Sequence, residues 1–99
     1  MRLTEKDRAM IRAVTKELTK GHGTAFVFGS RLDDNAKGGD WDIFISVNEP
    51  VENAPWLIAQ MASLLSRNSY GRKVDVVLAA PNLKTLPIHV VAARDGVLA

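Results

Sequence analysis

Two segments of the chain carry apolar residues at the spacing of a helix face. The first covers residues 4–20 and has its apolar positions at Met10, Ile11, Val14 and Leu18. Thr4, followed by the acidic Glu5 and Asp7, is typical of a helix N-cap. The second covers about residues 54–68, with apolar positions at Leu57, Ile58, Met61, Leu64 and Leu65. We therefore expect two amphipathic helices.

Three shorter apolar runs lie between polar or Gly- and Pro-containing breaks and predict β-strands. They cover residues 24–28, 41–47 and 72–79. The middle run alternates, with one face formed by Trp41, Ile43, Ile45 and Val47. Because Phe44 falls on the other face, we expect both faces of this strand to be covered. A final short helix is expected over about residues 88–94.

The expected order is helix, strand, strand, helix, strand, helix, with short connections. This order is typical of an α+β domain, with helices packed on a small mixed β-sheet. The 99 residues suffice for one domain, which we take as 1–99.

Composition and charge exclude little. Thirteen basic and 11 acidic residues give a net charge of +2, which is too small to argue for nucleic-acid binding by itself. The sequence has no cysteine, so disulfides and thiolate metal sites are excluded. Because it has neither a hydrophobic leader nor an apolar run of about 18 residues, we expect a cytoplasmic protein without a membrane-spanning helix.

Aspartates stand in two of the predicted strands, where an uncompensated charge is costly. Asp40 and Asp42 are two positions apart, which places them on the same side of a strand with Cα atoms roughly 6.5–7 Å apart. Carboxylates at this spacing can converge on a hard cation such as Mg²⁺. Asp75 stands in another apolar run and could lie beside this pair. Its repulsion with the pair would be relieved by a bound metal.

The dipeptide Gly29-Ser30 directly follows a predicted strand. Glycine lets a phosphate approach the backbone, and Ser30 offers a hydroxyl group and an N–H group to phosphate oxygens. Each of these residues could instead have a purely structural role. Ser30 can be a simple helix N-cap. Asp40 can belong to a turn with Asp42 on a solvent-facing edge, and Asp75 can pair with Arg72 or Lys73.

Together these motifs resemble the polymerase β-like nucleotidyltransferase superfamily, above all its small stand-alone minimal nucleotidyltransferases. The residues that carry the resemblance are Phe28-Gly29-Ser30-Arg31, Gly39-Asp40-Trp41-Asp42-Ile43-Phe44-Ile45, Val74-Asp75-Val76-Val77 and the ending Ala93-Arg94-Asp95-Gly96-Val97-Leu98. The resemblance covers nearly the whole chain.

The resemblance implies Mg²⁺-dependent transfer of a nucleoside monophosphate, with AMP from ATP as the expected case, onto an acceptor hydroxyl. It implies that Asp40 and Asp42 bind two Mg²⁺ ions, and that Asp75 completes one metal site and helps to deprotonate the acceptor. Gly29, Ser30 and Arg31 would bind the nucleotide phosphates. It further implies an antitoxin role with a helical HEPN-type partner protein as acceptor.

One feature departs from the family. Asp33 and Asp34 follow Gly29-Ser30-Arg31 where many members carry glycine and basic residues. This departure keeps a second hypothesis open, a non-catalytic nucleotide- or partner-binding module on the same fold. A third and weaker hypothesis is nucleic-acid binding by the basic residues of the first helix, Lys6, Arg8, Arg12, Lys16 and Lys20. Exposed sheet edges would also allow a homodimer.

Overall fold

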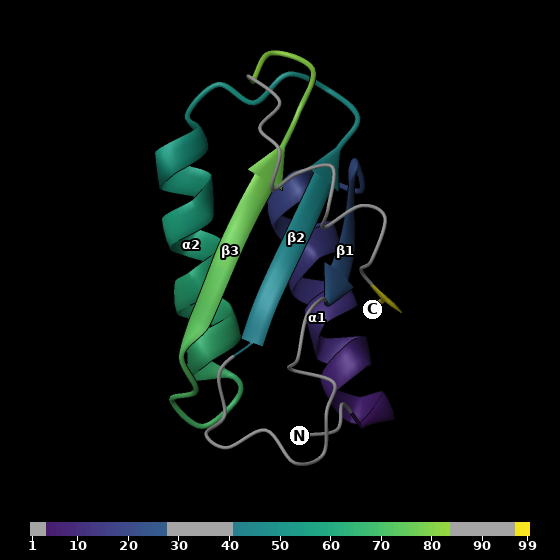
Figure 1. Cartoon of the computed structure of the whole chain (residues 1–99), viewed down its shortest axis with the longest axis vertical. Helices are drawn as coiled ribbons and strands as arrows, with labels where there is room; N and C mark the ends of the chain where they lie inside the picture. Colours follow the sequence, from purple (N-terminus) through teal and green to yellow (C-terminus); the bar gives the residue numbers. More distant parts are fainter. Residues whose placement is uncertain (1–3, 28–40, 84–96) are drawn as a thin grey trace.

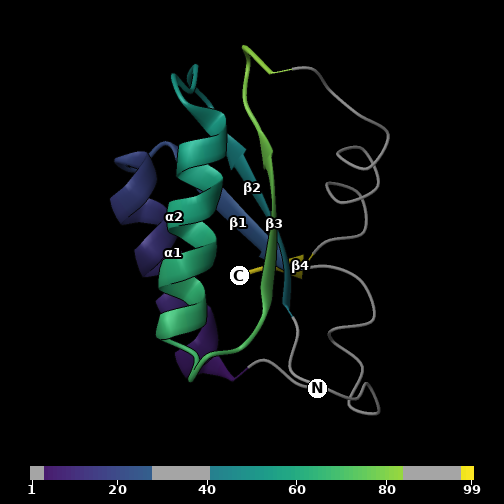
Figure 2. The ribbon, with the colours of Figure 1, turned by 90° about the vertical axis from the view of Figure 1, so that its left-hand side faces the viewer.

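In the computed structural model, the described residues are 4–27, 41–83 and 97–99. Their helices and strands are, in chain order, α1 (Glu5–Thr19), β1 (Gly23–Val27), β2 (Trp41–Val47), α2 (Ala54–Arg67), β3 (Val74–Ala79) and β4 (Val97–Leu98). The strands form one sheet (Figure 1). Both helices cover the same side of it (Figure 2). The α+β fold predicted from the sequence is confirmed.

At the start of each helix, a side chain accepts a hydrogen bond from a backbone N–H group that has no partner within the helix. At α1 the Asp7 N–H donates to Thr4 Oγ1 at 3.0 Å, and the Thr4 N–H donates to Asp7 Oδ2 at 3.2 Å. At α2 the Trp56 N–H donates to Asn53 Oδ1 at 3.2 Å. α1 ends at Thr19 and is followed by the C-cap Lys20, whose φ of 55° is left-handed. Short-range chemistry therefore sets these boundaries, close to the predicted ones.

The sheet is mixed, with the strand order β3-β2-β1-β4. β1 pairs antiparallel with β2 and with β4, whereas β2 and β3 are parallel. Parallel neighbours need a crossover connection, and α2 supplies it. As a result, the first residues of β2 and β3 meet at one end of the sheet.

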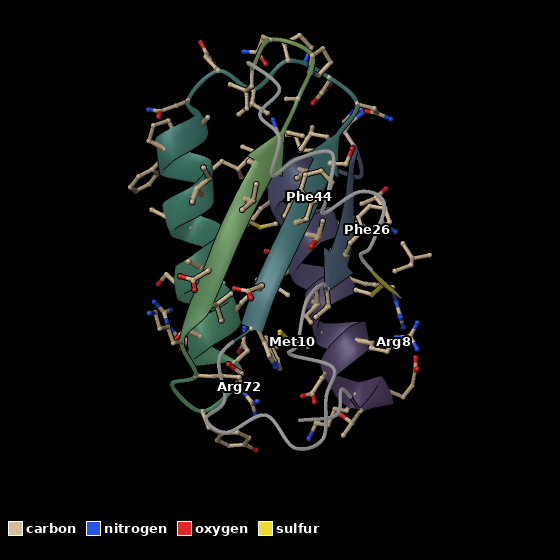
Figure 3. The ribbon with its side chains drawn as sticks, viewed as in Figure 1. Arg8, Met10, Phe26, Phe44 and Arg72 are labelled. Carbon is tan, nitrogen blue, oxygen red and sulfur yellow. The ribbon has the colours of Figure 1, made fainter. Side chains whose placement is uncertain are left out.

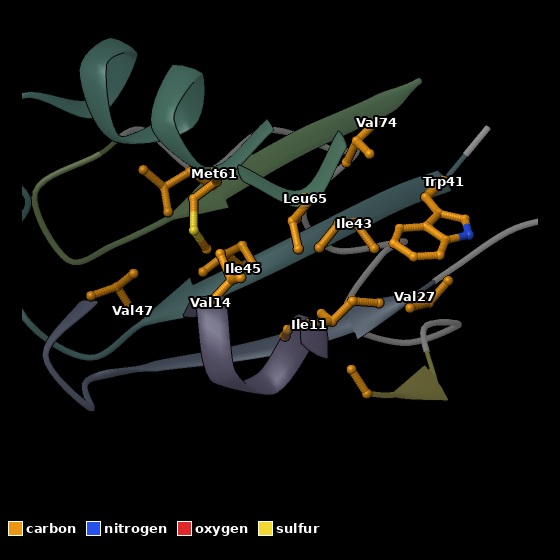
Figure 4. Packing of buried hydrophobic residues seen from close by; sticks show 13 residues of the cluster. Ile11, Val14, Val27, Trp41, Ile43, Ile45, Val47, Met61, Leu65 and Val74 are labelled. Atoms are coloured by element: carbon orange, nitrogen blue, oxygen red, sulfur yellow. The ribbon is translucent and has the colours of Figure 1, made fainter. Parts of the chain in front are cut away.

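The core lies between the sheet and the helices (Figure 4). β2 contributes its whole predicted inner face, and the helices contribute Ile11, Val14, Met61 and Leu65. Full burial of such a side chain stabilises the fold by about 1.5–3 kcal/mol. Phe44, on the opposite face of β2, is only 3% exposed. The prediction that β2 is covered on both faces is thus confirmed.

Some boundaries differ from those predicted. β3 begins at Val74 instead of residue 72, because the chain still turns at Gly71, whose φ is 79°. β1 begins one residue earlier, at Gly23. β4 was not predicted, because two residues are too short to show a pattern. The predicted helix over residues 88–94 lies outside the described residues.

Trp56, near the start of α2, does not pack into the core. It is 62% exposed, because α2 turns the side that carries Met61 and Leu65 towards the sheet. Neither of the two described helices is both long enough and apolar enough to cross a membrane.

Candidate functional site

The candidate site lies at the end of the sheet where β2 and β3 start. Trp41 is paired with Val74, and its N–H donates to the carbonyl oxygen of Lys73 at 2.9 Å. Val27, at the end of β1, lies opposite Ile43 and so belongs to the same end. Val27 and Trp41 flank the segment that contains the predicted site residues Gly29, Ser30, Arg31 and Asp40, which lie outside the described residues.

Asp42 and Asp75 are directly paired positions on the two parallel strands. Neighbouring strands lie about 4.8 Å apart, and paired residues of parallel strands point to the same face. This face is the one that α1 and α2 do not cover, because the neighbouring Trp41 and Val74 point into the core. Asp42 is partly buried and Asp75 is exposed. The register thus places side by side two carboxylates that are 33 positions apart in the sequence.

The pair has the donor chemistry that a hard divalent cation requires. Two like charges at paired positions repel each other. Mg²⁺ is commonly held by one or two carboxylates, with water and substrate phosphates as further ligands. Asp42 and Asp75 fit such a site. Within residues 4–27, 41–83 and 97–99 no three His, Cys, Asp or Glu side chains gather around a common point, so any third carboxylate must come from elsewhere.

Trp41 and Arg72 secure the same end of the sheet from the helix side. The Trp41 side chain is fully buried in the core, as expected for the strand face that it shares with Ile43, Ile45 and Val47. The guanidinium carbon of Arg72 lies 4.8 Å from the centre of the Trp41 ring, which is a cation–π contact. Figure 3 shows Arg72 beside the start of β3. Its positive charge therefore lies at the end of the sheet that carries both carboxylates.

Beyond the two carboxylates, the same face of the sheet carries apolar side chains. Phe44 follows Asp42 on this face, and its ring centre lies 5.9 Å from that of Phe26 on β1 (Figure 3). Across the strand pair, Phe44 is in register with Val77. The acidic end of this face is thus bounded by aromatic and aliphatic side chains.

Three hollows lie elsewhere among the described residues. Their volumes are about 280, 390 and 420 Å³, and neither Asp42 nor Asp75 lines any of them. His22 is engaged with its neighbours, since its Nδ1 lies 3.0 Å from Asn48 Oδ1 and its Nε2 lies 3.4 Å from Glu49 Oε2.

Sequence reasoning missed the role of Arg72. It was considered only as an ion-pair partner for Asp75, and no spacing rule relates it to a tryptophan 31 positions earlier. The sole sequence signal for this role is that Arg72 is a basic residue just before the start of a strand. No protein-family model matches the sequence, and no curated protein is measurably similar to it.

Proposed function

We propose that this protein is an Mg²⁺-dependent nucleotidyltransferase that transfers a nucleoside monophosphate, AMP from ATP, to an acceptor hydroxyl. One observation carries the proposal: Asp42 and Asp75 are in register on adjacent parallel strands. The sequence resemblance singles out these two residues, together with Asp40, as the metal ligands. Two acids that the resemblance requires to be neighbours are neighbours in the sheet.

Each residue has a stated role in the proposed reaction. Asp40, Asp42 and Asp75 would hold Mg²⁺, which supplies charge stabilisation for the attacking and leaving oxygens. Gly29, Ser30 and Arg31 would bind the triphosphate. The acceptor oxygen bonds to the α-phosphorus and the bond to pyrophosphate breaks, while Asp75 helps to remove the hydroxyl proton.

The acceptor that we propose is a hydroxyl on a helical HEPN-type partner protein, in an antitoxin role. The small minimal nucleotidyltransferases that the sequence resembles support this choice. Because the reaction consumes ATP, we propose that it takes place in the cytoplasm.

Label transfer from α-labelled ATP tests the proposal. We expect Mg²⁺-dependent labelling of a co-purifying protein, and a loss of at least about 100-fold in the rate for Asp42→Asn and for Asp75→Asn, because metal charge stabilisation is worth several kcal/mol. The exposed Glu17→Gln on α1 serves as a matched control and should label normally. Undiminished labelling by both Asp variants would contradict the assignment of these residues.

The alternative is a non-catalytic nucleotide- or partner-binding module. It is favoured by Asp33 and Asp34, two acids that follow Gly29-Ser30-Arg31 and would lie unfavourably close to a triphosphate. Calorimetric titration with ATP distinguishes the two functions. An ATP affinity that rises with Mg²⁺ and falls in Asp42→Asn supports the enzyme. An affinity that neither Mg²⁺ nor this substitution changes supports the binding module.

A further inference from the structure

The outer face of α2 is unusual for a surface helix because it is almost uncharged. Of its 14 residues, APWLIAQMASLLSR, the sole charged one is Arg67 in the last turn. From Trp56 onwards its exposed positions recur at three- and four-residue spacing and form one line along the helix; we call this line the α2 stripe, namely Trp56, Ala59, Ser63 and Arg67.

α1 provides the contrast within the same layer. Its exposed positions include Lys6, Arg12, Lys16 and Glu17, which is the usual charged outer face of an amphipathic helix. The lack of Lys, Asp and Glu on α2 and the presence of Trp56 and Arg67 agree with interfaces, where these acids and lysine are depleted and tryptophan and arginine are enriched. Figure 2 looks onto α2, which covers one side of the molecule.

The α2 stripe combines a protruding side chain, Trp56, with a hollow in the surface. Trp56 is 62% exposed. A hollow of about 420 Å³ lies along the stripe and is lined by Trp56, Ala59, Gln60, Ser63, Leu64 and Arg67. Trp56 also borders the hollow of about 390 Å³ at the end of α1, so that it forms a ridge between two depressions. The small side chains of Ala59 and Ser63 form the low middle of the stripe and leave room for the approach of another helix.

The order of residues along the stripe makes it complementary to itself. An aromatic ring stands at one end, a cation stands at the other, and small side chains lie between them. If a second α2 lies antiparallel on the first, Trp56 of each copy faces Arg67 of the other. The same antiparallel register places Ala59 of one copy within one residue of the position opposite Ser63 of the other. This follows because the Trp56–Arg67 pair and the Ala59–Ser63 pair have nearly the same midpoint along the helix. The two Arg67 charges then lie at opposite ends and do not repel each other.

We propose that the α2 stripe is an interface between two copies of this chain, related by a two-fold axis. In it, Trp56 of each copy packs into the hollow of the other and forms a cation–π contact with the partner copy's Arg67. The inference is independent of the proposed enzymatic function. Because one helix per copy buries less than the roughly 1,600 Å² of a standard interface, the association is expected to be weak and reversible.

Sedimentation equilibrium tests this interface over a chain concentration from about 10 μM to about 1 mM. We expect the wild-type chain to self-associate within this range. Trp56→Ala should weaken the dimer at least about tenfold, because a tryptophan that fills a hollow of the partner is a typical hot spot. Arg67→Glu should also weaken it, because the cation–π contact is lost. The control is Tyr70→Ala, which removes a 97% exposed aromatic residue that lies outside the stripe.

Circular dichroism should show that each variant keeps the wild-type fold, because all three side chains are exposed. The proposal is overturned if the wild-type chain remains monomeric at about 1 mM. It is also overturned if Trp56→Ala associates as strongly as wild type, or if Tyr70→Ala weakens the dimer equally. A monomeric chain that binds a different protein through Trp56 would assign the stripe to that protein instead.

Discussion

At the residue scale, Gly23 shows how closely α1 and β1 approach each other. A Cβ atom added at this position would lie 2.7 Å from both Cγ2 and Oγ1 of Thr19. Thr19 cannot easily yield, because it is 5% exposed and its hydroxyl donates to the Thr15 carbonyl at 2.6 Å. Position 23 therefore requires glycine, because there is no room for a Cβ atom.

We predict that Gly23→Ala lowers the free energy of unfolding by about 1–3 kcal/mol, the usual cost of overpacking. Urea denaturation measures this change. In a Thr19→Ala background, where the two closest atoms are absent, Gly23→Ala should cost clearly less. An equal loss in both backgrounds would show that the contact with Thr19 is not the cause.

At the scale of elements, the parallel pair β2–β3 carries the candidate site. Contacts between Trp41 and the residues just before β3 hold the two strands together where they begin. The Trp41 N–H bonds to the Lys73 carbonyl, and the Trp41 ring lies beneath the Arg72 guanidinium. Both contacts join the start of β2 to the residues just before β3. They hold the register that places Asp42 beside Asp75.

We predict that Arg72→Met destabilises the protein by about 0.5–2 kcal/mol, the range of a cation–π contact from exposed to desolvated. Hydrogen exchange at the Trp41 amide should accelerate more than exchange at core amides of α1, because the effect is local. The neighbouring Lys73→Met, at an exposed position, is the control. Equal acceleration in both variants would argue against the role of the ring contact.

At the scale of the whole molecule, a bound cation would relieve the repulsion between the paired carboxylates. Repulsion between like charges at paired strand positions costs roughly 0.2–1 kcal/mol. A ligand that binds the folded state alone adds stability according to its concentration and affinity. The stability of the protein should therefore depend on divalent cations through Asp42 and Asp75.

We predict that Asp75→Asn melts at a higher temperature than wild type in EDTA, because the repulsion with Asp42 is removed. Millimolar Mg²⁺ should raise the melting temperature of the wild-type chain and have a smaller effect on the variant. Differential scanning fluorimetry measures both shifts, with Glu17→Gln as the control. Equal Mg²⁺ stabilisation of wild type and Asp75→Asn would contradict a cation site at this pair.

Much of the local structure follows from the sequence because its causes are local. The spacing of Met10, Ile11, Val14 and Leu18, together with the cap at Thr4, is sufficient for α1. The alternation from Trp41 to Val47 likewise predicts both the bounds of β2 and its two covered faces. Such features depend on residues only a few positions apart.

The tertiary structure decided which distant residues meet. Nothing in the sequence around Asp42 or Asp75 specifies their register, which depends on how α2 packs and where β3 begins. The same is true of Arg72 over Trp41 and of Trp56 on an exposed stripe. The roles of Gly29, Ser30, Arg31 and Asp40 stay predictions from the sequence. Periodicity determines the elements and their buried faces, whereas contacts between elements arise only when the whole chain packs.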